Sequence, residues 1–376
     1  MQVYQDQTLK FNPILHGLRG LAALSVLLFH WGSGIGFFPQ ARAQMVVTTL
    51  GKEWDLGVFL DFGWLGVLLF FVLSGYLLTA QLLYRDLNKT NIPRFWLRRG
   101  LRIYPAFWLQ LLVLLIVARF FAFMPQSGSG PDIVRHTFLW INLPPWMTVP
   151  MNSVWWTLPV ELGFYLVLPL LVLLSNRLGW MKVFAGSVLV TILWRYAVMW
   201  FFKGENYASH QVVLDSIPGA LSTFCAGVAL AYFIARKGAP TRNQRYLVLI
   251  TSLVLSVAMA VWLYANLDTY WSGHWMLGVW NPLMGLLIAT LMLALLLPLR
   301  GFGWLASKPM VWLGHISFGI YLWHYPLLML LQRSILKDWQ TPSQSVMALF
   351  ITLAATLVLA SISYYFVERP IMRKRF

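Results

Sequence analysis

The sequence predicts an all-α protein, a polytopic membrane helix bundle of about ten transmembrane helices with both termini in the cytoplasm. Three observations favour this fold class. Apolar residues make up 59% of the 376 residues, and Asp, Glu, Lys and Arg only 11%, whereas about a quarter of a soluble domain is charged. Apolar segments of spanning length recur along the whole chain. The basic residues collect in alternate connections between these segments, as they do in membrane proteins.

Ten apolar segments, each about 20 residues long, could cross roughly 30 Å of hydrocarbon as α-helices. They run at 13–34, 62–84, 104–124, 153–175, 183–202, 213–235, 246–267, 278–299, 313–332 and 344–367. Glycines, prolines and single charges interrupt several segments, which membrane helices tolerate when neighbouring helices satisfy the backbone. No internal repeat or soluble domain separates them, so we expect a single membrane domain over residues 1–376.

The charges predict the topology. Nineteen of the 28 Lys and Arg residues fall in connections on the side of the N-terminus, six fall on the opposite side and three lie inside segments. Because cytoplasmic loops are enriched in Lys and Arg, this split places both termini in the cytoplasm and requires an even number of spans. The net charge of +16 is therefore explained by topology and by contact with membrane lipid. We expect no nucleic-acid partner.

Metal and haem sites are not expected. Cys225 is the single cysteine and lies in an apolar stretch, so the chain has neither a cysteine cluster for a metal nor an internal disulfide. His16 and His30 are 14 residues apart, a spacing that a two-haem bundle would use, but such a bundle needs a second helix with a matching pair. His315 and His324 are nine residues apart and would lie on opposite faces of a helix.

The first span carries the sharpest functional candidates, Arg19 and His30. They are 11 residues apart, which corresponds to about 1100° of helix rotation, so both side chains lie on one face with an axial separation of about 16 Å. Ionisable groups inside a span are expensive to bury and indicate function. The alternative is structural: Arg19 extends to the inner headgroups, and His30 is hydrogen-bonded to a neighbouring helix.

A second candidate site surrounds Glu161, in the sequence Ser153-Val-Trp-Trp-Thr-Leu-Pro-Val-Glu161. This span enters the membrane from the outside, and Glu161 lies about 12 Å into it by helical rise. His30 reaches a similar depth from the inside. The two groups could therefore form a general base and its orienting partner. The alternative is a structural pair that locks two helices together.

A third candidate is the basic run that contains Arg98, Arg99 and Arg102. If this run is helical, Arg102 neighbours both other arginines. Clustered guanidinium groups bind phosphate oxygens in a bidentate manner. The alternative is that a basic run beside a membrane sets the topology and contacts anionic lipid.

Several motifs, in this order and spacing, resemble the acyltransferase 3 family of integral membrane acyltransferases over nearly the whole chain. They are Arg19 with ten intervening residues and then His30, Phe70-Phe-Val-Leu-Ser-Gly-Tyr-Leu-Leu78, Arg99 and Arg102 followed by Ile103 and Pro105, the segment from Ser153 to Glu161, Ser317-Phe-Gly-Ile-Tyr-Leu-Trp-His-Tyr-Pro326, and Phe366-Val-Glu-Arg-Pro370. Thr157 stands where a serine is commoner in the family. We expect no C-terminal SGNH-type extension, which some members carry.

The resemblance implies an O-acyltransferase, in a bacterial inner membrane, that moves an acyl group from cytoplasmic acyl-CoA to a hydroxyl of a cell-surface or secreted carbohydrate or glycolipid. Acetyl is the expected acyl group, and no metal or haem cofactor is implied. The resemblance makes His30 the catalytic base, which we expect Glu161 to orient. It makes Arg99 and Arg102 part of the acyl-CoA site, to which we add Arg19 and Arg98.

Two mechanistic choices stay open at this stage. Transfer could be direct or could pass through an acyl-enzyme on His30 or Ser74. Arg195 or an indole N–H could stabilise the oxyanion of the thioester carbonyl. The residues that could line the site are Ser74, Tyr76, Trp155, Trp156 and Arg195.

A polytopic carbohydrate or lipid flippase, without acyl transfer, is the alternative function. Such a transporter also carries charged and aromatic groups within the membrane. It is expected to contain repeats related by symmetry, and the sequence contains none that we can identify. A purely structural membrane protein would need neither His30 nor Glu161.

Overall fold

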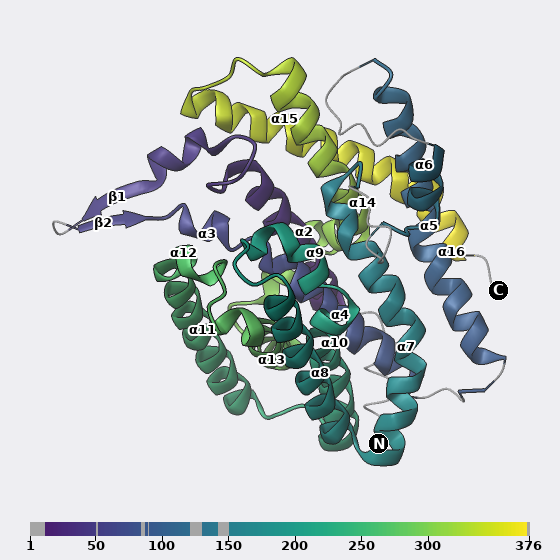
Figure 1. Ribbon diagram of the computed structural model, residues 1–376. Helices are drawn as coiled ribbons and strands as arrows, with labels where there is room; N and C mark the ends of the chain where they lie inside the picture. Colours follow the sequence, from purple (N-terminus) through teal and green to yellow (C-terminus); the bar gives the residue numbers. More distant parts are fainter. Residues whose placement is uncertain are drawn as a thin grey trace. The chain divides into compact units, whose positions relative to one another are not determined.

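The computed structural model describes residues 12–49, 52–83, 87–88, 90–120, 130–141 and 150–373. Helices dominate these ranges (Figure 1). The chain divides into two compact units, each assembled from segments far apart in sequence. Unit 1 comprises Met1–Arg19, Leu68–Trp96 and Val160–Val311, and unit 2 comprises Gly20–Val67, Leu97–Pro159 and Trp312–Phe376.

Nine helices in the described ranges are long and apolar enough to cross a membrane. The α-helices that provide these spans are α2 (Pro13–Gly32), α4 (Leu65–Leu82), α5 (Asn91–Val117), α7 (Thr157–Leu178), α8 (Trp180–Phe201), α10 (Ile217–Lys237), α11 (Arg242–Ala265), α13 (Met276–Leu295) and α15 (Pro342–Ile362). The one remaining predicted segment, 313–332, corresponds to helix α14 (Lys308–Leu330), which has 23 residues and is less apolar because it includes His315, Ser317 and His324. The all-α polytopic bundle predicted from the sequence is confirmed.

Shorter elements connect the spans or extend the last one. They are α3 (Val58–Asp61), α6 (Gly130–Thr137), α9 (Gln211–Leu214), α12 (Leu267–Tyr270), α16 (Arg369–Arg373), the 3₁₀ turns η1 (Pro39–Met45), η2 (Ser153–Trp156), η3 (Tyr207–His210) and η4 (Gly303–Ala306), and the π-helical turns η5 (Leu331–Ile335) and η6 (Ser363–Glu368). The connection after α2 also contains an antiparallel hairpin of β1 (Val46–Thr49) and β2 (Lys52–Asp55), in the register Val46–Asp55 to Thr49–Lys52. The sequence analysis did not predict this hairpin, although β1 is made entirely of β-branched residues.

Helix α5 begins earlier than predicted. The apolar segment was placed at 104–124, whereas the helix starts at Asn91 and includes the whole basic run. Arginine is a good helix former, and Pro105 is accommodated inside the helix. The three arginines of the run are therefore on one rigid helix.

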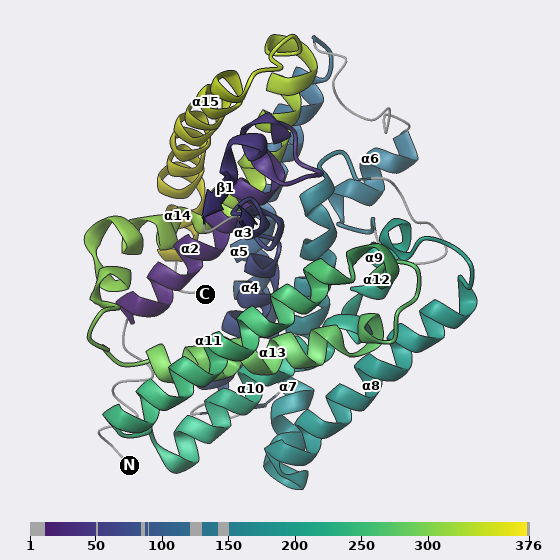
Figure 2. The ribbon, with the colours of Figure 1, turned by 90° about the vertical axis from the view of Figure 1, so that its left-hand side faces the viewer.

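Unit 1 is built around α10, whose residues are largely buried. Helix α10 contacts both α8 and α13, and α11 packs against α13 (Figure 2). Phe224 of α10 stacks on Phe71 of α4 and on Phe164 of α7, with ring centroids 4.3 and 4.0 Å apart. These stacked rings tie the helices that carry Ser74 and Glu161 to the centre of the unit.

Helices α4 and α10 approach each other through two glycines. A Cβ atom on Gly227 would lie 2.0 Å from the Val72 carbonyl oxygen, and one on Gly75 would lie 2.0 Å from the Phe224 carbonyl oxygen. Small residues permit this close backbone contact between membrane helices. The crossing fixes the position of Ser74 and Tyr76, which flank Gly75.

Gly227→Ala should destabilise the protein by about 3 kcal/mol, the upper end of the usual overpacking cost, because the clashing atoms belong to the backbone. The measurement is the thermal unfolding midpoint in detergent. Gly186→Ala in α8 is the matched control, since nothing lies within 4 Å of a Cβ atom there. Equal midpoints for the two variants would contradict the close helix crossing.

In unit 2 an apolar cluster surrounds the end of α2. It comprises the buried residues Trp31, Phe38, Ala41, Leu328, Leu331, Leu336 and Ala348. The Trp31 indole donates to the Ser345 carbonyl oxygen at 2.8 Å, and the Ser345 hydroxyl donates to the Phe38 carbonyl oxygen at 2.6 Å. Helices α2, α14 and α15 are thereby held together next to His30.

Candidate active site

His30 lies two residues before the end of α2 and is half-buried. Its Nδ1 atom is 3.0 Å from the Val26 carbonyl oxygen and 3.0 Å from Nε2 of His324 on α14. The ring also meets Tyr325 edge to face, with centroids 5.1 Å apart. Both hydrogen bonds engage Nδ1, so the imidazole is held on one side by two helices.

His324 is fully buried, and its Nδ1 is 2.9 Å from the Ile320 carbonyl oxygen. The sequence analysis used this residue only to argue against haem and gave it no role at the site. Its position within the motif Ser317–Pro326 was the available signal. The structure thus bears out one part of the structural alternative for His30, because a neighbouring helix does hold the ring.

The connection after α2 closes back on the end of that helix. The Phe37 N–H donates to the His30 carbonyl oxygen at 2.8 Å, and the Phe37 ring packs on Tyr325 with centroids 5.1 Å apart. The ring of Tyr325 thus contacts the rings of both His30 and Phe37. Tyr325 therefore borders the imidazole directly, and Phe37 packs against Tyr325.

Arg42 clamps this connection. Its guanidinium forms ion pairs with Asp55, at 2.6 Å, and with Asp61, and Asp61 accepts a hydrogen bond from the Gly34 N–H at 3.0 Å. Burial alone would lower the pKa of Arg42, but the hydrogen bonds to both carboxylates outweigh it and raise the pKa. The clamp therefore stays charged, and it fixes the chain beside His30.

In unit 1 the structure brings together two of the predicted site residues, Glu161 and Ser74. The Ser74 hydroxyl donates to Glu161 Oε1 at 3.3 Å, and the Tyr165 hydroxyl donates to the same oxygen. Tyr76 is buried two residues beyond Ser74. Glu161 and His30 belong to different units, so their pairing stays a prediction.

The arginines on α5 differ in their surroundings. Arg98 is exposed and Arg99 is half-buried. Arg102 forms an ion pair with Glu368, with 2.9 Å between Nη1 and Oε2, and its guanidinium carbon lies 5.7 Å from the centroid of the Phe318 ring. The Glu368 side chain is only 2% exposed. The sequence analysis missed this partner of Arg102, although Glu368 is part of the quoted C-terminal motif.

Trp155 is fully buried, and its indole N–H donates to Gln110 Oε1 at 2.7 Å. The Gln110 amide in turn donates to the Leu322 carbonyl oxygen at 2.5 Å. This contact occupies the Trp155 N–H that was considered as an oxyanion donor. Trp156, the other indole considered, is half-buried at the end of η2.

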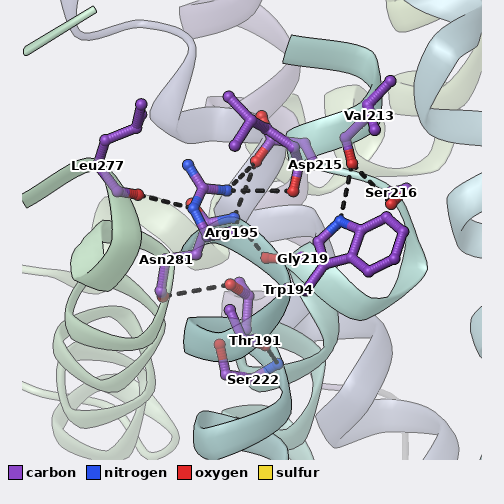
Figure 3. Close-up of polar contacts among 12 residues, drawn as sticks. Thr191, Trp194, Arg195, Val213, Asp215, Ser216, Gly219, Ser222, Leu277 and Asn281 are labelled. Carbon is purple, nitrogen blue, oxygen red and sulfur yellow. Dashed lines mark hydrogen bonds and ion pairs between the residues drawn. The ribbon is translucent and has the colours of Figure 1, made fainter. Parts of the chain in front are cut away.

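Arg195, in α8, lies in a polar cluster within unit 1 (Figure 3). Its Nε donates to the Leu277 carbonyl oxygen at 2.7 Å, and its Nη1 donates to Asp215 Oδ1 at 2.6 Å. The Asn281 amide donates to the same Asp215 oxygen and to the Gly219 carbonyl oxygen, both at 2.9 Å. These contacts join α8, α10 and α13 and give Arg195 a structural role. Its role in lining the site stays a prediction.

The described residues contain no group of three or more His, Cys, Asp and Glu side chains that could hold a metal ion. The groups that could take part in a reaction or bind a substrate are instead the paired imidazoles of His30 and His324, the carboxylate of Glu161 with its two hydroxyl donors, and the arginines of α5. The first can move a proton, and the last can bind phosphate.

Comparison with known proteins agrees with the resemblance noted from the motifs. The acyltransferase 3 family model, described as an acyltransferase domain, matches residues 12–365. The peptidoglycan O-acetyltransferase OatA of Listeria monocytogenes is 27% identical over 394 residues, which cover 98% of this chain and 57% of that protein. The O-acetyltransferase OatA of Staphylococcus aureus is 26% identical over 390 residues, which cover 98% of this chain and 58% of that protein. The chain thus spans less than two thirds of these relatives. No solved structure matches.

Proposed function

Because the chain belongs to the acyltransferase 3 family, we propose that it transfers an acetyl group from acetyl-CoA, bound at the cytoplasmic side of a bacterial inner membrane, to a carbohydrate hydroxyl. The observation that carries this proposal is the position of His30, a half-buried imidazole in a membrane span whose hydrogen bonds to other described residues are both made through Nδ1. An imidazole fixed in this way can act as a general base. The names of the relatives favour a cell-wall carbohydrate as the acceptor.

The proposed reaction is direct transfer. His30 takes the proton from the acceptor hydroxyl, and the hydroxyl oxygen attacks the thioester carbonyl carbon. The carbon–sulfur bond then breaks, and the CoA sulfur leaves and receives the proton from His30. The only cysteine, Cys225, is buried in α10, which does not favour a cysteine acyl-enzyme.

The donor is proposed to bind through the arginines. Arg98, Arg99 and Arg102 share one helix, and guanidinium groups suit phosphate oxygens because they offer paired donors. Arg19 lies on the same helix as His30, about 16 Å away along the axis. An extended pantetheine arm could cover this distance between the phosphates and the thioester.

Purified protein in lipid nanodiscs provides the direct test. It should release CoA thiol from acetyl-CoA and place the labelled acetyl group on a β-1,4-linked N-acetylglucosamine oligomer as an ester. Thiol release should rise when the oligomer is added, because the acceptor takes the acetyl group. Protein that neither cleaves acetyl-CoA nor acetylates the oligomer would contradict the proposed donor and acceptor.

A further inference from the structure

The His30–His324 contact allows the protons on both rings to be assigned. The two imidazoles come from α2 and α14, and their centroids are 5.1 Å apart at an interplanar angle of 36°. Three nitrogen contacts fix the arrangement: His30 Nδ1 to the Val26 carbonyl, His30 Nδ1 to His324 Nε2, and His324 Nδ1 to the Ile320 carbonyl. All these residues belong to unit 2.

The assignment begins at His324. A carbonyl oxygen only accepts hydrogen bonds, so His324 Nδ1, at 2.9 Å from the Ile320 carbonyl oxygen, carries a proton. A neutral imidazole has one donor and one acceptor nitrogen, which makes His324 Nε2 the acceptor. The neutral form is favoured because the side chain is fully buried, and an unpaired buried charge is expensive.

The same reasoning then applies to His30. Its Nδ1 faces two acceptors, the Val26 carbonyl oxygen and His324 Nε2, each at 3.0 Å. A proton on Nδ1 satisfies both, whereas a lone pair there would face two other lone pairs. His30 therefore carries its proton on Nδ1, and its Nε2 holds the free lone pair.

We propose that His324 is a positioning residue that fixes His30 in the Nδ1–H tautomer and so leaves His30 Nε2 as the basic atom of the acyl transfer. This inference rests on the proposed function of His30 as the base. When Nε2 takes the acceptor proton, the ring becomes positively charged. Its Nδ1–H continues to donate to the Val26 carbonyl and to His324, and both acceptors stabilise the charge as it develops. His324 then has the orienting role that the sequence analysis gave to Glu161.

The test compares His324→Phe with His324→Gln. Phenylalanine fills the space without an acceptor, so kcat should fall about 10- to 100-fold, as when the partner of a functional imidazole is removed. The KM for acetyl-CoA should stay near the wild-type value. Glutamine can place an oxygen near the position of Nε2 and accept from His30 Nδ1, so this variant should keep most of kcat. If His324→Phe does not fold, His324→Asn replaces it, because its shorter side chain cannot reach that position, and the same loss is expected.

His315→Phe is the matched control. It removes an imidazole from the same helix while keeping an aromatic ring opposite Tyr364, whose centroid is 5.8 Å away. Its activity should remain near that of the wild type. The double variant His30→Ala/His324→Phe should be no slower than His30→Ala, because His324 acts only through His30.

Three results would overturn the inference: normal kcat in His324→Phe, equal losses in the Phe and Gln variants, or a further loss in the double variant. The failure of the proposed function would look different. Normal transfer by His30→Ala would refute His30 as the base whatever His324 does. An inactive His30→Ala protein together with a normal His324→Phe protein would refute only the role of His324.

Discussion

His30→Ala should lower acetyl transfer by about 10²- to 10⁴-fold, the usual contribution of a well-placed general base, while the protein still inserts and purifies. The imidazole is half-buried, so its loss should leave the helix assembly intact. The rate of acetyl ester formation under saturating acetyl-CoA is the measurement.

His16→Ala is the control for this variant, because it removes another half-buried histidine from the same helix. It should transfer acetyl groups at close to the wild-type rate. Turnover near normal in His30→Ala would show that the first-span motif is structural. Glu161→Gln tests which residue orients His30. A loss of activity as large as that of His30→Ala would favour Glu161 as the orienting partner, and a milder loss would favour His324.

Arg102→Ala should weaken CoA binding at least about tenfold, because a charge-assisted hydrogen bond to phosphate contributes about 1.5–3 kcal/mol. Arg102→Lys should also weaken it, since lysine keeps the charge but not the paired donors. Calorimetric titration of CoA into solubilised protein measures the affinity. The structure adds a second effect, because loss of Arg102 leaves the buried Glu368 carboxylate without its ion-pair partner. Removing one partner of a buried pair costs about 3–5 kcal/mol of stability.

The double variant Arg102→Ala/Glu368→Gln separates these two effects. Glutamine at position 368 removes the buried negative charge that has lost its partner, so thermal stability should recover. CoA affinity should remain low if Arg102 contacts phosphate. Recovery of both properties would show that Arg102 serves only to hold the C-terminal segment. In that case Arg19 and the basic connection at 236–245 become the next candidates for the donor phosphates.

The features that the sequence predicted well depend only on residues that are close together in the chain. Each span is a largely apolar segment of about 20 residues, which can be located without any knowledge of other helices. Helical periodicity likewise places Arg19 and His30 on one face of their own helix. Helix α5 was placed too late because its first turns are basic, and apolarity does not report helix formation in a charged segment. The β1–β2 hairpin was missed because it lies in a connection that carries no span signal.

Pairings between distant segments could not be predicted. His30 and His324 are 294 positions apart, and Arg102 and Glu368 are 266 apart. Periodicity within one helix does not indicate which other helix it meets. Arg195 is a further residue whose partners could not be predicted, and here the sequence suggested a function where the structure gives a structural role. An arginine inside a span indicates function by default, but its contacts with Asp215 and two backbone carbonyls provide a structural reason for its presence.

His30 and His324 are far apart in the sequence, and this has a consequence during protein synthesis. At about 5–20 residues per second, the ribosome needs roughly 15–60 s to translate the 294 positions from His30 to His324. Throughout that time α2 exists without α14, and the Nδ1–H of His30 can use only the Val26 carbonyl within its own helix. The proposed base therefore gains its contact with His324 only after α14 has been made. A chain that ends before α14 would therefore lack the contact that holds the ring of the proposed base from a second helix.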